Sequence, residues 1–347
     1  MISISLCMIV KNEEKVLARC LDSIKDLMDE IIIVDTGSTD RTKEIAYRYT
    51  DKVYDFVWTQ DFSEARNFSF SKATKDYIYV ADADEVLDEE NRKVFFQLKQ
   101  VLLPEIDIVQ MYYSNQMQHN TTYNFDKEYR PKLYKRLREF HWQDPIHESV
   151  CLDPIVYDSE ISILHMPENN HSSRDFSVFQ NMIKKGKRVS KKLHNMYARE
   201  LYITGEKKDF TEAKEFFQAS IMDESRGIDE IKEAALVLAK CFRLDGNIQQ
   251  FFKYIMKDIV TEPSSEACCE LGTFYLELED YEEASNWFLN AMEGTEPILN
   301  IRSKEELPKV GLKKCYESLA EKAKENGNKE LSEKYNEAII QLEVEKE

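Results

Sequence analysis

The segment that decides the fold reads IIIVDTGSTD and spans residues 31–40. Four consecutive aliphatic residues are typical of a strand that is buried on both faces. Gly37 predicts a tight turn after the strand, because glycine accepts backbone conformations that other residues avoid. Ligands of open α/β sheets bind beyond the carboxyl ends of strands, so Asp35 is expected to face a ligand. Residues 38–40 fit turn and helix-cap roles instead.

Strands and helices alternate on both sides of this segment. Further strands are predicted over residues 4–10 and 77–81, and helices from about 13 to 27 and from residue 40. This order predicts an α/β domain with a mostly parallel sheet and helices on its faces. After residue 195 the apolar spacing indicates only helices, each of roughly 12 to 16 residues, separated by Gly, Asp or Asn.

The helical part repeats itself in the tetratricopeptide (TPR) pattern. Gly272 and Ala284 are small enough to let two helices approach, and Tyr275 and Phe288 fill the space between helix pairs. Ala213 precedes Ala284 by 71 residues, which is close to twice the 34-residue TPR period. An irregular helical bundle is the alternative. Stacked pairs would bury a continuous core and present a concave face.

Composition excludes several classes of function. The 347 residues carry 47 Lys+Arg and 65 Asp+Glu, a net charge of -18 that disfavours binding to nucleic acid or anionic lipid. Residues 1–194 hold 27 basic and 32 acidic side chains, net -5, and residues 195–347 hold 20 and 33, net -13. Only Gly37 and Gly186 precede residue 195, which argues against a Walker loop or a GxGxxG turn. Seven cysteines without metal-type spacing indicate reduced thiols and a cytoplasmic location, and we expect no signal peptide or transmembrane segment.

Two carboxylates follow the strand predicted over residues 77–81. Asp82 and Asp84 are separated by one residue at the strand end, where they can converge on one hard cation such as Mg²⁺ or Mn²⁺. A lone DxD is a weak motif, and the acidic run continues with Glu85, Asp88, Glu89 and Glu90. Those four are expected to form the solvated start of a helix, where acidic residues are favoured.

Four motifs together carry a resemblance to a known family. LCMIVKNEE (6–14), VDTGSTD (34–40), FSEARN (62–67) and DADE (82–85) resemble family 2 glycosyltransferases of the GT-A fold, in the family's order and spacing. The resemblance covers roughly residues 1–170. The attached TPR-like segment is similar to that of a bacterial subgroup that includes peptide glycosyltransferases of the sublancin type, which glycosylate cysteine in bacteriocins.

The resemblance implies a nucleotide-sugar donor, most simply a UDP-sugar, and assigns roles to this chain's residues. The base would donate a hydrogen bond to Asp35, and a diphosphate would share a cation with the carboxylates. Arg66 suits either a donor phosphate or the pinning of carboxylates in the site, and a structural salt bridge is its alternative. The expected donor-binding residues are Val10, Glu13, Asp35, Arg66 and Asp82, and the expected metal ligands are Asp84, Asp82 and His165, although a lone histidine such as His165 is equally often structural.

The acceptor side is expected in FHWQDPIHES, residues 140–149, which resembles the family's acceptor segment. Glu148 is the first choice for the general base, with Asp144 in reserve, and a capping or salt-bridge role is the alternative for both. Trp142 suits a platform for sugar or acceptor, or equally the core. The basic run RPKLYKR (130–136) suits a solvated strand face or a phosphate contact. His119, His171 and His194 are expected at the surface.

These observations predict a metal-dependent inverting glycosyltransferase with a UDP-hexose or UDP-N-acetylhexosamine donor and a peptide or protein acceptor. A polysaccharide or lipid-linked acceptor and a catalytically inactive scaffold are the alternatives, and a nucleotidyltransferase is disfavoured because no Gly-rich loop is present. The predicted organisation is a GT-A domain over 1–170, a helical connector over 171–194 and a TPR-like domain over 195–347, with possible homodimerisation through the repeats.

Overall fold

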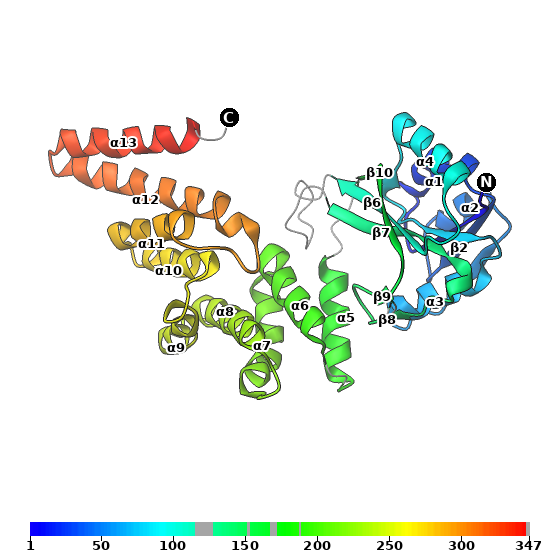
Figure 1. Cartoon of the computed structure of the whole chain (residues 1–347). Helices are drawn as coiled ribbons and strands as arrows, with labels where there is room; N and C mark the ends of the chain where they lie inside the picture. The colour runs from blue at the N-terminus through cyan, green and yellow to red at the C-terminus, as the bar shows by residue number, and fades with distance from the viewer. Residues whose placement is uncertain (115–127, 151–152, 167–171, 187–188, 345–347) are drawn as a thin grey trace. The chain divides into compact units, whose positions relative to one another are not determined.

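The computed structural model describes residues 1–114, 128–150, 153–166, 172–186 and 189–344. The chain divides into two compact units, an N-terminal unit from Met1 to Lys187 and a C-terminal unit from Arg188 to Glu347 (Figure 1). The predicted fold class is confirmed. A mostly parallel sheet with helices on both faces forms the first unit, and helices follow in the second.

The N-terminal unit is built on an eight-stranded sheet in the order β3-β2-β1-β4-β7-β6-β10-β5. Strands β3, β2, β1 and β4 are parallel neighbours, β7 is antiparallel to both β4 and β6, β10 is parallel to β6, and β5 is antiparallel to β10. A separate pair of short strands, β8 and β9, lies beside this sheet. The elements are β1 (Ile4–Val10), α1 (Leu17–Ile24), η1 (Lys25–Leu27), β2 (Glu30–Asp35), α2 (Thr42–Ala46), β3 (Val53–Asp55), α3 (Phe62–Lys72), β4 (Tyr77–Val80), β5 (Glu85–Val86), α4 (Glu89–Val101), β6 (Ile108–Ser114), β7 (Glu128–Lys135), η3 (Arg136–Arg138), β8 (Trp142–Gln143), β9 (Ser149–Val150), β10 (Val156–His165) and α5 (Ser172–Lys184).

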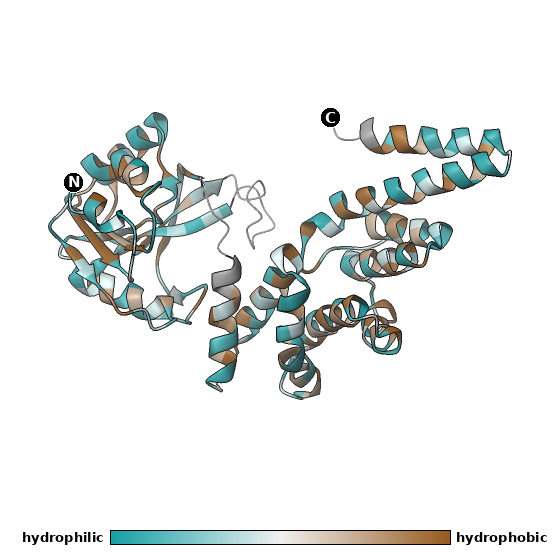
Figure 2. Cartoon of the chain, turned by 180° about the vertical axis from the view of Figure 1, so that it is seen from behind, coloured by the Kyte–Doolittle hydropathy of each residue, from teal (hydrophilic) through white to brown (hydrophobic). Residues whose placement is uncertain are grey.

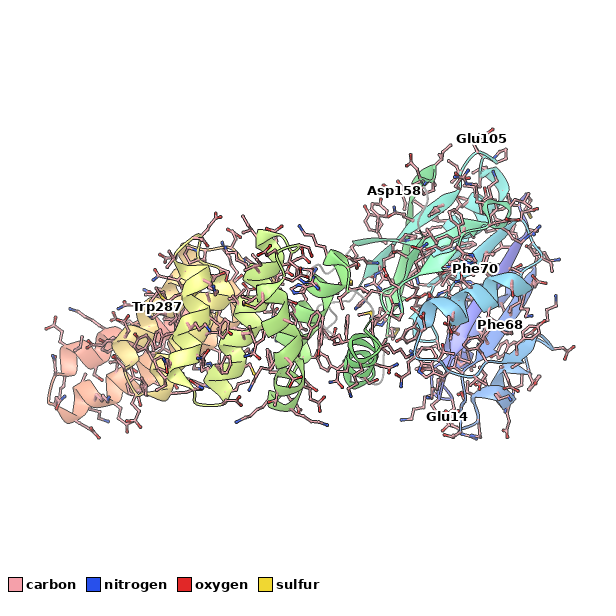
Figure 3. All side chains as sticks on the ribbon, turned by 90° about the horizontal axis from the view of Figure 1, so that it is seen from below. Glu14, Phe68, Phe70, Glu105, Asp158 and Trp287 are labelled. Atoms are coloured by element: carbon pink, nitrogen blue, oxygen red, sulfur yellow. The ribbon has the colours of Figure 1, made fainter. Side chains whose placement is uncertain are left out.

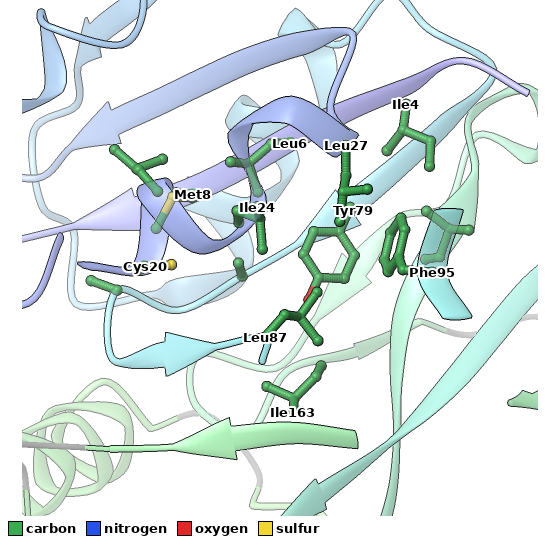
Figure 4. Close-up of a cluster of buried hydrophobic side chains, with 14 of the residues drawn as sticks. Ile4, Leu6, Met8, Cys20, Ile24, Leu27, Tyr79, Leu87, Phe95 and Ile163 are labelled. Atoms are coloured by element: carbon green, nitrogen blue, oxygen red, sulfur yellow. The ribbon is translucent and has the colours of Figure 1, made fainter. Parts of the chain in front are cut away.

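Helices cover the two faces of the sheet unequally. One face packs on α1, α2 and α4, and its core includes Leu6, Tyr79 and Phe95. The rings of Tyr79 and Phe95 lie next to each other in Figure 4, with their centres 5.3 Å apart. The other face packs on α3, where Cys7, Ile32 and Ile78 form a smaller apolar cluster. Because β1, β2 and β4 are parallel neighbours, their carboxyl ends lie side by side along the same edge of the sheet, across the strand ends.

The predicted elements are found with shifted boundaries. Strand β1 has the predicted bounds, but α1 begins at Leu17 rather than near residue 13, because Asn12 takes a positive φ of 57° and a turn precedes the helix. Helix α2 has only five residues. Before this helix, Ser38 and Asp40 accept hydrogen bonds from Asn12 N and Glu14 N of the loop after β1.

The C-terminal unit contains successive antiparallel helices, and its apolar residues gather on the packed faces (Figure 2). Some helices also contact the next helix but one along the chain: α8 contacts α6 and α10, and α10 contacts α12. This pattern is expected for stacked helix pairs. Gly272 has the predicted role, since a Cβ there would lie 2.8 Å from ring carbons of Phe288. The helices are α6 (Lys191–Thr204), α7 (Lys207–Met222), α8 (Ile228–Leu244), α9 (Ile248–Ile259), α10 (Ser265–Glu277), α11 (Tyr281–Glu293), η4 (Ile301–Ser303), α12 (Glu306–Glu325) and α13 (Lys329–Val344).

Of three histidines expected at the surface, one needs correction and two lie outside the described residues. His194 was expected at the surface but is fully buried, because its ring packs against Phe216 and Phe217 and its Nδ1 lies 2.8 Å from Glu233 Oε2. His119 and His171 lie outside the described residues. Among described helices, none is both long and apolar enough to cross a bilayer. The domain boundaries at residues 170 and 194 stay predictions.

Candidate active site

Asp35 lies at the carboxyl end of β2 with one carboxylate oxygen in use and one free. Its Oδ1 accepts hydrogen bonds from Gly37 N at 3.0 Å and Ser38 N at 2.9 Å, and Gly37 has the positive φ of 100° that this turn requires. Asp35 is 1% exposed, and its Oδ2 is buried without a hydrogen bond from the residues that the structure describes. A buried acceptor without a donor is costly, so this oxygen is suited to a ligand N–H or O–H.

The loop after β1 is bonded to the loop after β2. Val10 is opposite Asp35 in the parallel register, and its carbonyl accepts from Thr36 N at 3.0 Å. Asn12 N donates to Ser38 Oγ, Thr39 N donates to Asn12 Oδ1, and Glu13 N donates to Thr42 Oγ1. Ser38 therefore joins two loops, while the Asp40 carboxylate accepts from Thr42 N in a local turn, in agreement with its expected turn role. Val10 is therefore fixed opposite Asp35, and Glu13 is held against Thr42 at the start of α2.

The acidic motif after β4 meets the end of β10. His165 Nε2 lies 3.3 Å from Asp84 Oδ2, with the two side chains 13% and 14% exposed. Asp82 is exposed beside them. Desolvation opposes ionisation of Asp82, but the charges of Lys132, Arg66 and Arg130 outweigh it and lower its pKa. The structure thus brings two of the three predicted metal ligands together and keeps the third ionised.

Glu85 does not have the role expected from the sequence. It was expected to be a solvated residue at a helix start, but it is 2% exposed and forms an ion pair with Lys132 of β7, which is 5% exposed. Burial raises the pKa of Glu85, and the Lys132 charge opposes this rise. The reason is topological, since β5 pairs with β10 and turns Glu85 into the sheet. Only the later acids of the run follow the expectation, with Asp88 capping α4.

Lys132 fits neither alternative considered for the basic run of residues 130–136, because it is paired with Glu85. Its ammonium group is buried and lies 5.2 Å from the centre of the Tyr113 ring, so it is not part of a solvated strand face. Arg130 lies over the same ring at 3.9 Å. The alternating pattern of β7 contains no signal that distinguishes Lys132 from its neighbours, because the burial comes from its partner Glu85.

Arg66 of α3 holds the predicted base. Its Nη2 and Nε donate to Glu148 Oε1 at 2.8 and 3.2 Å, and both side chains are 11% exposed. Desolvation would lower the pKa of Arg66, but Glu148 and Asp82 reverse this and raise it. Arg66 Nη1 is buried without a hydrogen bond in the described part of the chain. The guanidinium thus joins the acceptor-side carboxylate to the edge that carries Asp82.

The acceptor segment alternates buried and exposed residues around Trp142, with His141 and Gln143 exposed. Trp142 is 7% exposed and meets Phe70 and Tyr134 at ring separations of 5.5 and 5.2 Å, so it lies in the core and is no platform for a ligand. Asp144 is half-buried and has a positive φ of 74°. The roles assigned to Glu148 and Asp144 stay predictions. Across the described ranges, no three His, Cys, Asp or Glu side chains are grouped closely enough to enclose a metal ion alone.

Part of the N-terminal unit matches a family of known proteins. Residues 5–152 match the family described as Glycosyl transferase family 2. These residues form a family 2 glycosyltransferase domain. A TPR repeat-containing protein of Synechococcus elongatus is 52% identical over 87 residues, 25% of this chain and 22% of that protein. The SPbeta prophage-derived glycosyltransferase SunS of Bacillus subtilis is 38% identical over 103 residues, 29% of this chain and 24% of that protein.

The family 2 domain is also similar to solved structures at low identity. The crystal structure of glucosyl-3-phosphoglycerate synthase from Mycobacterium tuberculosis with Mn²⁺ and UDP-glucose aligns with a TM-score of 0.38 at 14% identity, over 55% of this chain and 81% of that chain. The chain spans about a quarter of the length of the two curated relatives named above.

Proposed function

We propose that this chain is a metal-dependent, inverting glycosyltransferase that uses a UDP-hexose or UDP-N-acetylhexosamine. The observation that carries the proposal is the shared sheet edge. There the free, buried Oδ2 of Asp35 and the contact between Asp84 and His165 lie at the ends of strands that belong to one sheet. A nucleotide-sugar donor would place its nucleobase at Asp35 and its diphosphate near Asp84 and His165.

On the donor side, Asp35 Oδ2 would accept the N–H of a uracil-type base, and Val10 and Glu13 would line the same end of the edge. Asp82 would accept ribose hydroxyls or a metal-bound water, consistent with its lowered pKa. Arg66, whose Nη1 is free within the described residues, would offer a charged donor to the diphosphate.

The residues present fit a divalent cation. Asp84 and His165 supply one oxygen and one nitrogen donor 3.3 Å apart, and Asp82 supplies a further oxygen nearby, a donor set that suits Mn²⁺ or Mg²⁺ together with phosphate oxygens. The cation would neutralise charge on the diphosphate as it leaves. Because Glu85 is neutralised by Lys132, the carboxylates left for the cation are Asp82 and Asp84.

On the acceptor side, Glu148 would remove the acceptor proton, with Asp144 in reserve. Both bonds from Arg66 fall on Glu148 Oε1, so Arg66 would orient the carboxylate while Oε2 takes the proton. One base and direct displacement predict inversion at the anomeric carbon, with the acceptor atom bonding to that carbon as the diphosphate departs.

For the acceptor we propose a peptide or protein, held by the concave face of residues 195–347. The net charge of -13 on these residues favours acceptors with basic or polar segments, whose affinity would weaken with added salt. A polysaccharide or lipid-linked acceptor, homodimerisation through the repeats and an inactive scaffold remain the competing proposals. Transfer assays with each acceptor class separate them.

Thermal unfolding of the full chain with UDP and Mn²⁺ tests the donor site. Ligand at 100 times its Kd stabilises a protein by about 2.7 kcal/mol, which corresponds to a rise of roughly 5–10 °C in the Tm of a domain this size. Asp35→Asn should lose most of this rise with or without metal, because the amide presents a donor or a weaker acceptor to the base. Asp84→Asn should lose only the Mn²⁺-dependent part.

The matched control is Asp55→Asn. Asp55 ends β3, next to Asp35 in the sheet register, but its side chain is 77% exposed and pairs with Lys43. This variant should keep the full response. A wild-type chain whose Tm does not respond to UDP with Mn²⁺, or to any of a panel of nucleotide sugars, would contradict the proposed function.

A further inference from the structure

The side chain of Asn67 binds the acceptor segment as a neighbouring strand would. Asn67 Nδ2 donates to the Trp142 carbonyl at 3.0 Å, and Trp142 N donates to Asn67 Oδ1 at 2.8 Å. Trp142 opens β8, which pairs with β9 and, among the described strands, with no strand of the large sheet. One amide therefore satisfies both backbone groups of a residue at the start of a short strand.

Other groups of α3, from the backbone and from side chains, contact the same segment. Phe62 N donates to the Pro145 carbonyl at 2.9 Å, Arg66 binds Glu148, and the Phe70 ring packs edge-on against Trp142. Positions 62, 66, 67 and 70 share one side of a helix. Phe68, labelled with Phe70 in Figure 3, packs instead on Tyr54 and Phe56. One side of α3 therefore sets where the segment with both candidate bases lies.

We propose that Asn67 is a positioning residue for the acceptor segment. This inference rests on the proposed function and extends it to a residue outside the proposed donor and acceptor contacts. The apolar contacts of the Trp142 ring hold β8 near α3 but are not directional, whereas two hydrogen bonds fix its backbone in register. Without them β8 can shift, and Glu148 and Asp144 shift with it. A misplacement of about 1 Å can cost on the order of 10²-fold in rate.

The test compares Asn67→Leu with Ser71→Ala in the full chain. Leucine has the same number and branching of side-chain heavy atoms as asparagine and favours helix, so Asn67→Leu removes both hydrogen bonds. Its methyl groups are bulkier than the amide, and the cost of that bulk is read from Tm. Ser71 lies on the same helix, and its hydroxyl donates within that helix to the Phe68 carbonyl at 2.7 Å. Turnover of UDP-glucose and UDP-N-acetylglucosamine with Mn²⁺ gives kcat and KM, and Tm reports folding.

Asn67→Leu should lower kcat by about 10²-fold with the nucleotide-sugar KM unchanged within about two-fold, while Ser71→Ala matches wild type. A folded Asn67→Leu with wild-type kcat overturns the positioning role alone, even if its Tm is lower, because a structural role would change only Tm. Equal losses in both variants also overturn it. A wild-type chain that neither binds UDP nor turns over either sugar overturns the proposed function, and this role with it.

Discussion

Removal of the Lys132 charge would test how much the buried ion pair between Lys132 and Glu85 stabilises the N-terminal unit. Lys132→Met keeps the length of the side chain but leaves Glu85 buried without its partner, since the two side chains are only 6% and 2% exposed. Removing one member of a buried ion pair costs about 3–5 kcal/mol, because the remaining charge loses its partner but stays out of water. We therefore expect the free energy of unfolding of the N-terminal unit to fall by this amount at pH 7.

The loss should depend on pH with a defined sign. Desolvation already raises the pKa of Glu85 above its ordinary value, and removing the opposing Lys132 charge raises it further. A carboxyl whose folded-state pKa is raised gives its full stability below its unfolded pKa, near 4.5, and loses it as pH rises through the folded pKa. The defect of Lys132→Met should therefore shrink as pH falls from 8 towards 5.

Urea unfolding followed by tryptophan fluorescence measures this defect. Trp58 and Trp142 report on the N-terminal unit, and a Trp287→Phe background removes the signal of the C-terminal unit. The double variant Lys132→Met/Glu85→Leu should recover most of the stability, because an apolar pair can replace a buried ion pair at little cost.

The matched control is Lys135→Met on the same strand. Lys135 is 27% exposed and lies 4.0 Å from Asp107, so its loss should cost less than about 1 kcal/mol. A loss below about 1 kcal/mol for Lys132→Met at pH 7, or a loss that does not change between pH 5 and pH 8, would refute the reasoning.

Three further predictions concern catalysis, packing and the division of labour between the units. Glu148→Gln should keep donor binding and lose about 10²–10⁴-fold in kcat, because an amide cannot take the acceptor proton. Gly272→Ala should cost the C-terminal unit about 1–3 kcal/mol in urea unfolding, since its Cβ would lie 2.8 Å from Phe288 ring carbons. A chain ending at Lys192 should bind UDP with metal, measured by calorimetry, and fail to transfer sugar to a peptide.

Each of these predictions has a result that contradicts it. Normal turnover by Glu148→Gln together with an inactive Asp144→Asn would assign the base to Asp144. Gly294→Ala is the packing control, because its Cβ would meet only a backbone oxygen at 3.5 Å, and an equal loss there would contradict the packing argument. Equal peptide transfer by the shortened and full chains would mean that the repeats do not hold the acceptor.

The sequence alone predicted the features that depend on neighbours along the chain. Aliphatic runs predicted β1, β2 and β4, because a strand buried on both faces must be apolar along its whole length. Gly37 predicted the turn at Asp35, since few other residues take its φ of 100°. The spacing of small and aromatic residues around Gly272 predicted close helix packing in the C-terminal unit.

Only the tertiary structure decided what each charged side chain faces. Glu85 and Lys132 are 47 residues apart, and Arg66 and Glu148 are 82 apart, so neither pairing leaves a local pattern. Three acidic residues of one short motif have different surroundings: Glu85 is buried in an ion pair, Asp84 contacts a histidine, and Asp82 is exposed. A charged group is neutralised by whichever opposite charge the strand order brings within reach, and that order is a property of the whole sheet rather than of any single segment.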